Sequence, residues 1–498
     1  MNRTVTFFDT TLRDGEQTPS VSFTTEDKVI IARALDKLGV DVIEAGFPIS
    51  STGELDAVKK VAHLGLRATI CGNARVLTPD IDACLNSDVG LIHVFASTSD
   101  VQLKYSMKKT REEVYEMSID AVDYVKDHGV RCLFSAMDAT RTDLQFLLRI
   151  CKGVESAKVD IINIPDTVGI MAPFKMYALI RAVKNAIQAP IDVHCHNDFG
   201  LAVANSISAV EAGANQVQVT VNGIGERAGN ADLAQTVMSL HSIYNIKSKI
   251  MTKYLLETSR LVERYTKINL QPNMPIVGEN AFSHESGIHS RGVIARPDTF
   301  EPGIMTPEMV GHHRRLIAGK HAGKHGIKEM LKDAGFEPSE EQLTEITKRI
   351  KEIGDKGKRV TDLDLYTIAE AVTSDVLQPS IMLEEVSVMT GNRVTPTATV
   401  KAIVDGKEMV GARIGVGPVD AAINAVHEII GGAEMQLRTF KIESISGGTD
   451  ALAEVIIGVE DDKGNIVTAR AAREDIVLAS VEAMVSAMNR LKAKNGGQ

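Results

Sequence analysis

The chain has 498 residues, of which 44% are hydrophobic and none is tryptophan. Its 55 Lys and Arg residues against 65 Asp and Glu residues give a net charge of −10, which argues against nucleic-acid and anionic-membrane partners. At roughly 100 to 200 residues per domain, the length predicts two or three domains. The sequence contains no apolar run of about 18 residues, so we expect no membrane span. Five cysteines and no secretory-type leader favour reduced thiols and a cytoplasmic location.

Roughly the first 260 residues alternate short β-branched runs with longer helical patterns, which is typical of parallel strands joined by crossover helices. Eight such units fit a closed (β/α)8 TIM barrel better than an open doubly wound sheet. The segment LRDGEQ after the first strand lacks the glycine-rich dinucleotide fingerprint. We therefore predict an α/β fold with its chemistry at the carboxyl ends of strands that begin near Val5, Val42, Ala68, Leu91, Arg131, Asp160, Ile191 and Gln216.

The pattern changes after about residue 270. The proline-rich segment Gln271 to Thr306 predicts an irregular linker, and helical patterns follow at Pro338–Gly354 and Val360–Leu377. From about Leu383 the chain is β-rich and repeats itself, because two strands followed by a helix occur twice. We predict a catalytic barrel over residues 1–270, helical linker subdomains over 271–382, and a C-terminal α+β regulatory domain of two ββα-like repeats over 383–498.

His194 and His196 close the seventh predicted strand in the sequence HCHND. The period of two in a strand puts both imidazoles on one face, where they can share a divalent ion if oxygen ligands arrive from neighbouring strands. Asp14, after the first strand, and Asn230, after the eighth, are the candidates. The pattern predicts a site for zinc, manganese or cobalt, with magnesium also open. The alternative is a pair of structural histidines.

Arg13 is next to the proposed ligand Asp14. A guanidinium beside a metal suits a 2-oxoacid, because arginine can hydrogen-bond the carboxylate while the metal takes the keto oxygen. Thr167, after the sixth strand, is a candidate to add a hydroxyl to that carboxylate. The alternatives are a surface salt bridge for Arg13 and a turn cap for Thr167.

Seven segments, in chain order, carry a resemblance to a known family: DTTLRDGEQT, EAGFP, DTVG, HCHNDFG, NGIGERAGN, SHESGIH and GKHAGKHG. Along essentially its whole length, the chain resembles the acetyl-CoA-dependent 2-oxoacid condensing enzymes, which comprise 2-isopropylmalate, citramalate and homocitrate synthases. In the C-terminal repeat, GVGPVDAAINAV and GGTDA resemble a leucine-binding regulatory domain. The resemblance implies a divalent metal (Mn²⁺, Zn²⁺ or Mg²⁺) on Asp14, His194, His196 and Asn230, with Arg13 and Thr167 on the 2-oxoacid carboxylate.

The implied activity is an acyl transfer, in which a metal-assisted Claisen condensation joins acetyl-CoA to a 2-oxoacid and hydrolysis of the thioester releases CoA. The family points to His289, in the SGIH segment, as the base. Ser135, Phe95 and Phe47-Pro48 resemble the pocket of 2-isopropylmalate synthases, which implies 2-oxoisovalerate as substrate and a place in leucine biosynthesis. The resemblance also implies a homodimer with leucine as its effector.

Two departures from the family pattern concern the active site. Met137 replaces the glutamate of a Ser-x-Glu sequence after the fifth strand. Since Met137 cannot transfer protons, we predict that Asp138 or Glu226 takes that role. Gln102 stands in the substrate-pocket segment where relatives commonly have histidine.

Three other functions remain open from the sequence alone. A citramalate synthase would use pyruvate and respond to isoleucine. A non-catalytic paralogue, suggested by Met137, would keep the metal and bind a metabolite as a sensor. A metal-dependent amidohydrolase also uses an HxH pair, but in those barrels the pair follows the first strand and here it follows the seventh.

Overall fold

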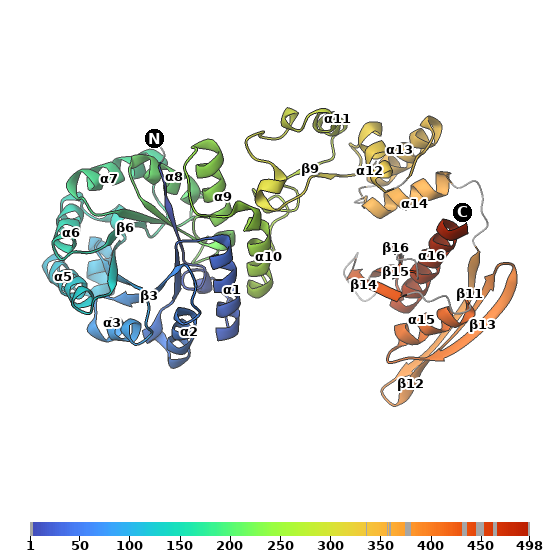
Figure 1. The fold of residues 1–498 in the computed structure, drawn as a ribbon, viewed down its shortest axis with the longest axis horizontal. Coiled ribbons are helices and arrows are strands. Elements are labelled where there is room, and N and C mark those ends of the chain that lie inside the picture. The colour runs from blue at the N-terminus through green and yellow to red at the C-terminus, as the bar shows by residue number, and fades with distance from the viewer. Residues whose placement is uncertain are drawn as a thin grey trace. The chain divides into compact units, whose positions relative to one another are not determined.

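Eight parallel strands close into a barrel in the first part of the chain, drawn in blue to green in Figure 1 of the computed structural model. β1 pairs with both β2 and β8, which closes the sheet. The strands are β1 Thr6–Asp9, β2 Val42–Gly46, β3 Thr69–Arg75, β4 Leu91–Ser97, β5 Arg131–Met137, β6 Ile161–Asp166, β7 Ile191–Cys195 and β8 Gln216–Val219. Each begins within one residue of its predicted start, and the predicted TIM barrel is confirmed.

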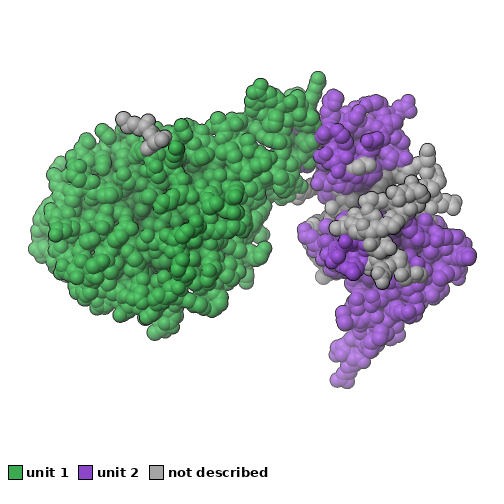
Figure 2. All heavy atoms as spheres, in the orientation of Figure 1, with its two compact units in different colours: residues 1–284, 288–316 green, residues 285–287, 317–498 purple. Residues whose placement is uncertain are grey.

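The structure describes residues 3–334, 336–355, 357, 360–373, 380–430, 436–444, 453–461 and 466–496. They form two compact units, residues 1–284 with 288–316 and residues 285–287 with 317–498 (Figure 2). Within the described ranges, no helix is long and apolar enough to cross a lipid bilayer.

Amphipathic helices follow the barrel strands. Those of the barrel are α1 Thr25–Leu38, α2 Thr52–Ala62, α3 Thr78–Leu85, α4 Asp100–Gln102, α5 Arg111–Asp127, α6 Leu144–Ser156, α7 Pro173–Ala186, α8 Ala202–Ala212, α9 Leu233–Met238 and α10 Leu255–Thr266. Local sequence fixes their ends: in α1, Thr24 and Asp27 form a capping box, and Gly39 ends the helix with a φ of 95°.

Inward-facing side chains change character along the barrel axis. One apolar layer takes a residue from each of the first six strands: Phe8, Val42, Cys71, Leu91, Leu133 and Ile161. Two residues further along, the same strand faces carry polar side chains, among them Glu44, His93 and Asn163, because a strand repeats with a period of two. An apolar layer therefore closes the barrel below a polar floor at the carboxyl ends of the strands.

The segment predicted as an irregular linker contains a helix, α11 Gly287–Ala295, so that prediction is wrong there. Its glycines and the prolines around it conceal the helix in the sequence, although Ser290 and Val293 are buried. A short parallel pair, β9 Ser283–His284 with β10 Arg315–Leu316, flanks it. The predicted helices near residues 340 and 360 are present as α13 Glu340–Asp355 and α14 Asp362–Thr373, preceded by α12 Lys324–Asp333.

The C-terminal part contains two three-stranded antiparallel sheets with helices, which confirms its α+β character. The elements are β11 Ile381–Gly391, β12 Val394–Val404, β13 Lys407–Ile414 and α15 Pro418–Ile429, then β14 Gln436–Ser444, β15 Ala453–Glu460, β16 Ile466–Arg473 and α16 Ile476–Gly496. The prediction of two strands per repeat is therefore wrong, because each repeat has three among the described residues. The missed first strands, β11 and β14, both contain register shifts, which interrupt the alternation that identifies a strand.

Candidate active site

A cavity of about 260 Å³ lies at the carboxyl ends of the barrel strands. It is lined by Arg13, Asp14, Gln17, Phe47, Asn73, His93, Phe95, Ser135, Met137, Asn163, Pro165, Thr167, His194, His196, Gln218, Glu226 and Arg227. Eight of the predicted site residues belong to this lining. The other four, Gln102, Asp138, Asn230 and His289, do not.

Asp14, His194 and His196 form a buried group whose ligand atoms all lie within 4.8 Å of one another. Oδ2 of Asp14 is 3.8 Å from Nε2 of His194 and 4.0 Å from Nε2 of His196. Two ligand atoms that each lie roughly 2.0 to 2.2 Å from a Zn²⁺ ion are about 3 to 4 Å apart. The spacing is therefore that of a divalent metal site.

Asn230 adjoins this group from the loop after β8. Its Nδ2 donates to Oδ1 of Asp14 at 2.8 Å, whereas its own buried Oδ1 accepts no hydrogen bond from the described residues. Gly225 leaves room for the pair, because a Cβ there would overlap Nδ2 of Asn230 and lie 2.9 Å from Oδ1 of Asp14. A cation would satisfy the unpartnered oxygen.

The protonation states suit a cation ligand set. Burial lowers the pKa of His194, and burial together with His194 lowers the pKa of His196 to about 3. Burial alone would raise the pKa of Asp14, but Arg13 and the two imidazoles outweigh it and lower that pKa to about 2. Near neutral pH the site thus offers a carboxylate and two uncharged imidazoles.

Arg13 is held beside the metal group by two carboxylates. Its Nε donates to Oε2 of Glu44 and its Nη1 donates to Oδ2 of Asp14, each at 2.7 Å. The side chain is 15% exposed and lines the cavity, so it is not a surface salt bridge. Among the described residues, Nη2 of Arg13 has no hydrogen-bond partner, which leaves it available to an anionic ligand.

Three regions of the chain match known families. Residues 4–262 match the HMGL-like family, and residues 276–358 match the homocitrate synthase post-HMGL domain-like family. Residues 359–492 match the LeuA allosteric (dimerisation) domain. Within this last region, the GGTDA segment noted in the sequence lies outside the described residues.

The chain is 62% identical over 496 residues to a probable 2-isopropylmalate synthase of Methanosarcina acetivorans, covering 99% of this chain and 96% of the relative. It is 53% identical to the 2-isopropylmalate synthase of Methanocaldococcus jannaschii, with 98% and 95% covered. The chain belongs to the 2-isopropylmalate synthase family. The (R)-citramalate synthase of Methanocaldococcus jannaschii is less similar, at 47% identity with 98% and 99% covered.

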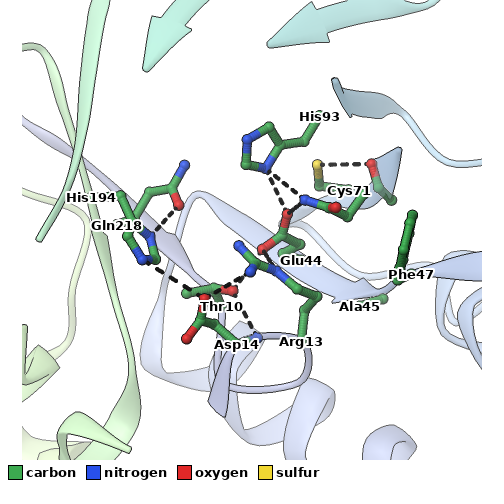
Figure 3. Close-up of polar contacts among 12 residues, drawn as sticks. Thr10, Arg13, Asp14, Glu44, Ala45, Phe47, Cys71, His93, His194 and Gln218 are labelled. Carbon is green, nitrogen blue, oxygen red and sulfur yellow. Dashed lines mark hydrogen bonds and ion pairs between the residues drawn. The ribbon is translucent and has the colours of Figure 1, made fainter. Parts of the chain in front are cut away.

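In this member of the 2-isopropylmalate synthase family, Glu44 organises one wall of the cavity (Figure 3). Its Oε2 also accepts from Oγ1 of Thr10 at 2.6 Å, and its Oε1 accepts from Nδ1 of His93 at 2.7 Å and Nδ2 of Asn73 at 2.9 Å. Burial alone would raise the pKa of Glu44, but Arg13 and His93 lower it well below its usual range. In the sequence Glu44 stands out only as part of the EAGFP segment, although a carboxylate inside an otherwise apolar strand was a usable signal.

Two hydroxyls in the cavity have opposite hydrogen-bonding characters. Ser135 donates its hydrogen to Oδ1 of Asn163 at 2.6 Å, so it presents lone pairs to the cavity. Thr167 accepts from the backbone N of Asp138 at 2.9 Å, so its hydrogen is free to donate. The contact links Thr167 to the segment after β5, 29 residues away in the sequence, so it is not a cap of the local turn.

The apolar side of the cavity includes Phe47, Phe95, Met137 and Pro165. The Phe47 and Phe95 rings lie 6.3 Å apart between centroids. Met137 thus brings a thioether into the cavity at the position where the family pattern has a carboxylate.

Asp138 and Glu226, the two candidates for the missing acid–base group, lie in different surroundings. Asp138 is wholly buried outside the cavity lining, where its carboxylate accepts from Ser99 and from Nη2 of Arg141, the latter at 2.7 Å. Glu226 belongs to the lining. The other residues placed outside the lining are Gln102, whose Oε1 is buried, and His289 on α11, whose ring stacks on Phe300 at 4.3 Å.

Proposed function

We propose that this chain condenses acetyl-CoA with 2-oxoisovalerate and water to give 2-isopropylmalate and CoA, the first committed step of leucine biosynthesis. The observation that carries the proposal is the position of Arg13, which lines the same cavity as Asp14, His194 and His196. A metal group beside a partly unpaired guanidinium is suited to a 2-oxoacid.

A divalent ion, Mn²⁺, Zn²⁺ or Mg²⁺, would be held by Asp14, His194, His196 and Asn230. When bound, it supplies a Lewis acid for the keto group. The ligand set of one carboxylate, two imidazoles and one amide oxygen supports this range of metals.

The remaining cavity groups orient the 2-oxoacid. Arg13 and the free hydrogen of Thr167 bind its carboxylate, because both are donors. The isopropyl group packs against Phe95, Met137 and Pro165. An apolar wall of this kind favours isopropyl over methyl by about 1 to 3 kcal/mol for each methylene-sized difference.

Proton transfer completes the reaction. A base removes a proton from the acetyl methyl group, the electron pair of that C–H bond forms the new C–C bond to the keto carbon, and a proton is delivered to the keto oxygen. Water then cleaves the thioester and CoA leaves as the thiol. We assign the removal of the methyl proton to His289 and the delivery of a proton to the keto oxygen to Glu226. Glu226 lines the cavity and Asp138 does not, which favours Glu226 for this role.

We further propose that residues 1–270 are catalytic, 271–382 form linker subdomains, and 383–498 bind leucine as a feedback inhibitor in a homodimer. Since no cysteine of the chain is in a disulfide, the enzyme suits the reducing cytoplasm.

Release of CoA thiol from acetyl-CoA tests the proposal, with 2-oxoisovalerate, pyruvate and 2-oxoglutarate supplied in turn. We expect the highest kcat/KM with 2-oxoisovalerate and inhibition by leucine. Arg13→Met should abolish release with every 2-oxoacid. Preference for pyruvate with inhibition by isoleucine would establish a citramalate synthase instead.

A non-catalytic sensor is the second candidate, and Met137 is the observation that favours it. It predicts tight metal binding with no thiol release from any of the three 2-oxoacids.

A further inference from the structure

Asp192 is a wholly buried carboxyl group inside the barrel, on the same face of β7 as His194. It does not line the cavity. Its Oδ2 accepts two hydrogen bonds, from Nε2 of Gln218 at 2.6 Å and from Nδ2 of Asn163 at 2.8 Å. Whether or not Oδ1 carries a proton, Oδ2 is an acceptor, so both amides must turn their NH₂ groups toward it.

The opposite end of each amide reaches a cavity residue. Oε1 of Gln218 lies 2.8 Å from Nδ1 of His194, and Oδ1 of Asn163 accepts from Oγ of Ser135 at 2.6 Å. Since Asp192 fixes these amide oxygens toward the cavity, Nδ1 of His194 must carry the hydrogen. Its Nε2 is then a bare lone pair on the side of Asp14, 3.8 Å away.

His196 lacks this arrangement. Its Nδ1 lies 2.9 Å from Nη2 of Arg227. That Nη2 group has only two hydrogens, and it also donates to the backbone O of Thr167 and to Asp198. His194 is therefore the imidazole whose tautomer this hydrogen-bond chain holds in the ligand form.

The same chain fixes the polarity of Ser135. Because the serine hydrogen is committed to Asn163, Ser135 repels a carbonyl or carboxylate oxygen, whereas Thr167 and Arg13 attract one. This difference orients a 2-oxoacid with its carboxylate toward Arg13 and its alkyl group toward Ser135.

We propose that Asp192 is a positioning residue that acts through two amides, holding His194 in its metal-binding tautomer through Gln218 and directing the Ser135 hydroxyl through Asn163. The effect on substrate orientation rests on the proposed function, but the tautomer of His194 does not. The two can therefore be tested separately.

The first test is nuclear magnetic resonance of the metal-free full chain labelled with ¹⁵N-histidine, with the His194 signals identified by loss in His194→Gln. We expect the Nδ1–H tautomer at His194 in the parent and in Asn163→Leu, and loss of that preference in Gln218→Met. An Nε2–H tautomer in the parent, or an unchanged tautomer in Gln218→Met, would overturn the proposal.

The second test is Co²⁺ affinity by calorimetry. Gln218→Met should weaken binding by about 10 to 100-fold, whereas Asn163→Leu should stay within about twofold of the parent. Asp192→Asn should weaken it as well, because an asparagine can turn its own NH₂ group toward Gln218. Equal losses of Co²⁺ affinity in Gln218→Met and Asn163→Leu would indicate a general structural effect and contradict the proposal. This comparison needs only the two amide variants, so it can be made even if Asp192→Asn does not fold.

The third test requires the reaction. Asn163→Leu should raise the KM for the 2-oxoacid more than it lowers kcat. If the His194 tautomers are as expected but the parent shows no turnover, the proposed reaction is contradicted. The role of Asp192 at His194 would still stand.

Discussion

Oε2 of Glu44 lies 2.7 Å from Nε of Arg13, so a buried carboxylate directly behind the cavity lining holds an arginine that lines the cavity (Figure 3). Glu44 is wholly buried and the Arg13 side chain is 15% exposed, so little water screens the attraction. The second oxygen of Glu44 holds His93, which lines the same cavity. One carboxylate thus fixes a cation and an imidazole together.

Removal of the Glu44 charge should weaken binding of an anionic substrate. In Glu44→Gln, Arg13 keeps only Asp14 as a charged partner, and breaking a buried pair costs about 3 to 5 kcal/mol. We expect kcat/KM for the 2-oxoacid to fall at least about tenfold, mainly through KM, with a lower Tm. Glu112→Gln, which breaks the surface pair with Arg149, should leave both quantities unchanged. An unaltered KM in Glu44→Gln would show that the pair does not orient Arg13.

Restoring a carboxylate at residue 137 should increase turnover. A general acid or base in the cavity contributes about 10² to 10⁴-fold, and Met137 lines the cavity where such a group could act. We expect Met137→Glu to raise kcat in the thiol-release assay. Met137→Gln has nearly the same shape but no titratable group, so it should not. Equal rates in both variants would show that a carboxylate at residue 137 adds nothing to the transfer that we assign to Glu226.

Metal binding should stabilise the folded chain. A ligand at about 100 times its Kd adds about 2.7 kcal/mol to the free energy of unfolding. We therefore expect Mn²⁺ or Zn²⁺ to raise the Tm of the parent, and a chelator to reverse the rise. His196→Ala should lose most of the shift, whereas His241→Ala, outside the site, should keep it. A shift of equal size in both variants would place the metal elsewhere.

Asp9 should make stability fall with rising pH. Burial raises the pKa of this carboxyl from its ordinary 3.8 to about 7. The folded state therefore retains a proton that the unfolded state releases, and stability is lost between these two values at about 1.4 kcal/mol per pH unit. Asn cannot ionise, so Asp9→Asn does not lose stability in this way as the pH rises. The free energy of unfolding of Asp9→Asn minus that of the parent should therefore increase from about pH 5 to about pH 7.

Urea unfolding at several pH values measures this difference. Asp56→Asn, the same substitution at an exposed aspartate, is the control. A pH-independent difference for Asp9→Asn would show that Asp9 is ionised in the folded chain.

The barrel was predictable because its strands are buried on both faces and read as short continuous β-branched runs. β7 illustrates this: five buried residues begin at the predicted Ile191, and the position of the two histidines on one face followed from the strand period. Strands β11 and β14 were not predicted, because their register shifts interrupt that period.

The hydrogen-bond partners of the buried polar groups were not predictable. Glu44 meets Asn73, 29 residues away, and His93, 49 residues away, only because β2, β3 and β4 are neighbours in the closed sheet. The alternatives for Arg13 were decided in the same way, since its exposure depends on how the loop after β1 sits on the barrel. Sequence spacing identifies the strand on which a side chain lies but not its neighbours.

The five cysteines, Cys71, Cys84, Cys132, Cys151 and Cys195, are all buried and free within the barrel. Burial raises the pKa of each thiol, that of Cys151 to about 12, so almost none is a thiolate at neutral pH. A thiol-reactive dye should therefore leave the folded chain unlabelled and count released CoA without a protein background. Without substrates, the rate at which the same dye labels the cysteines would measure how often the barrel opens spontaneously.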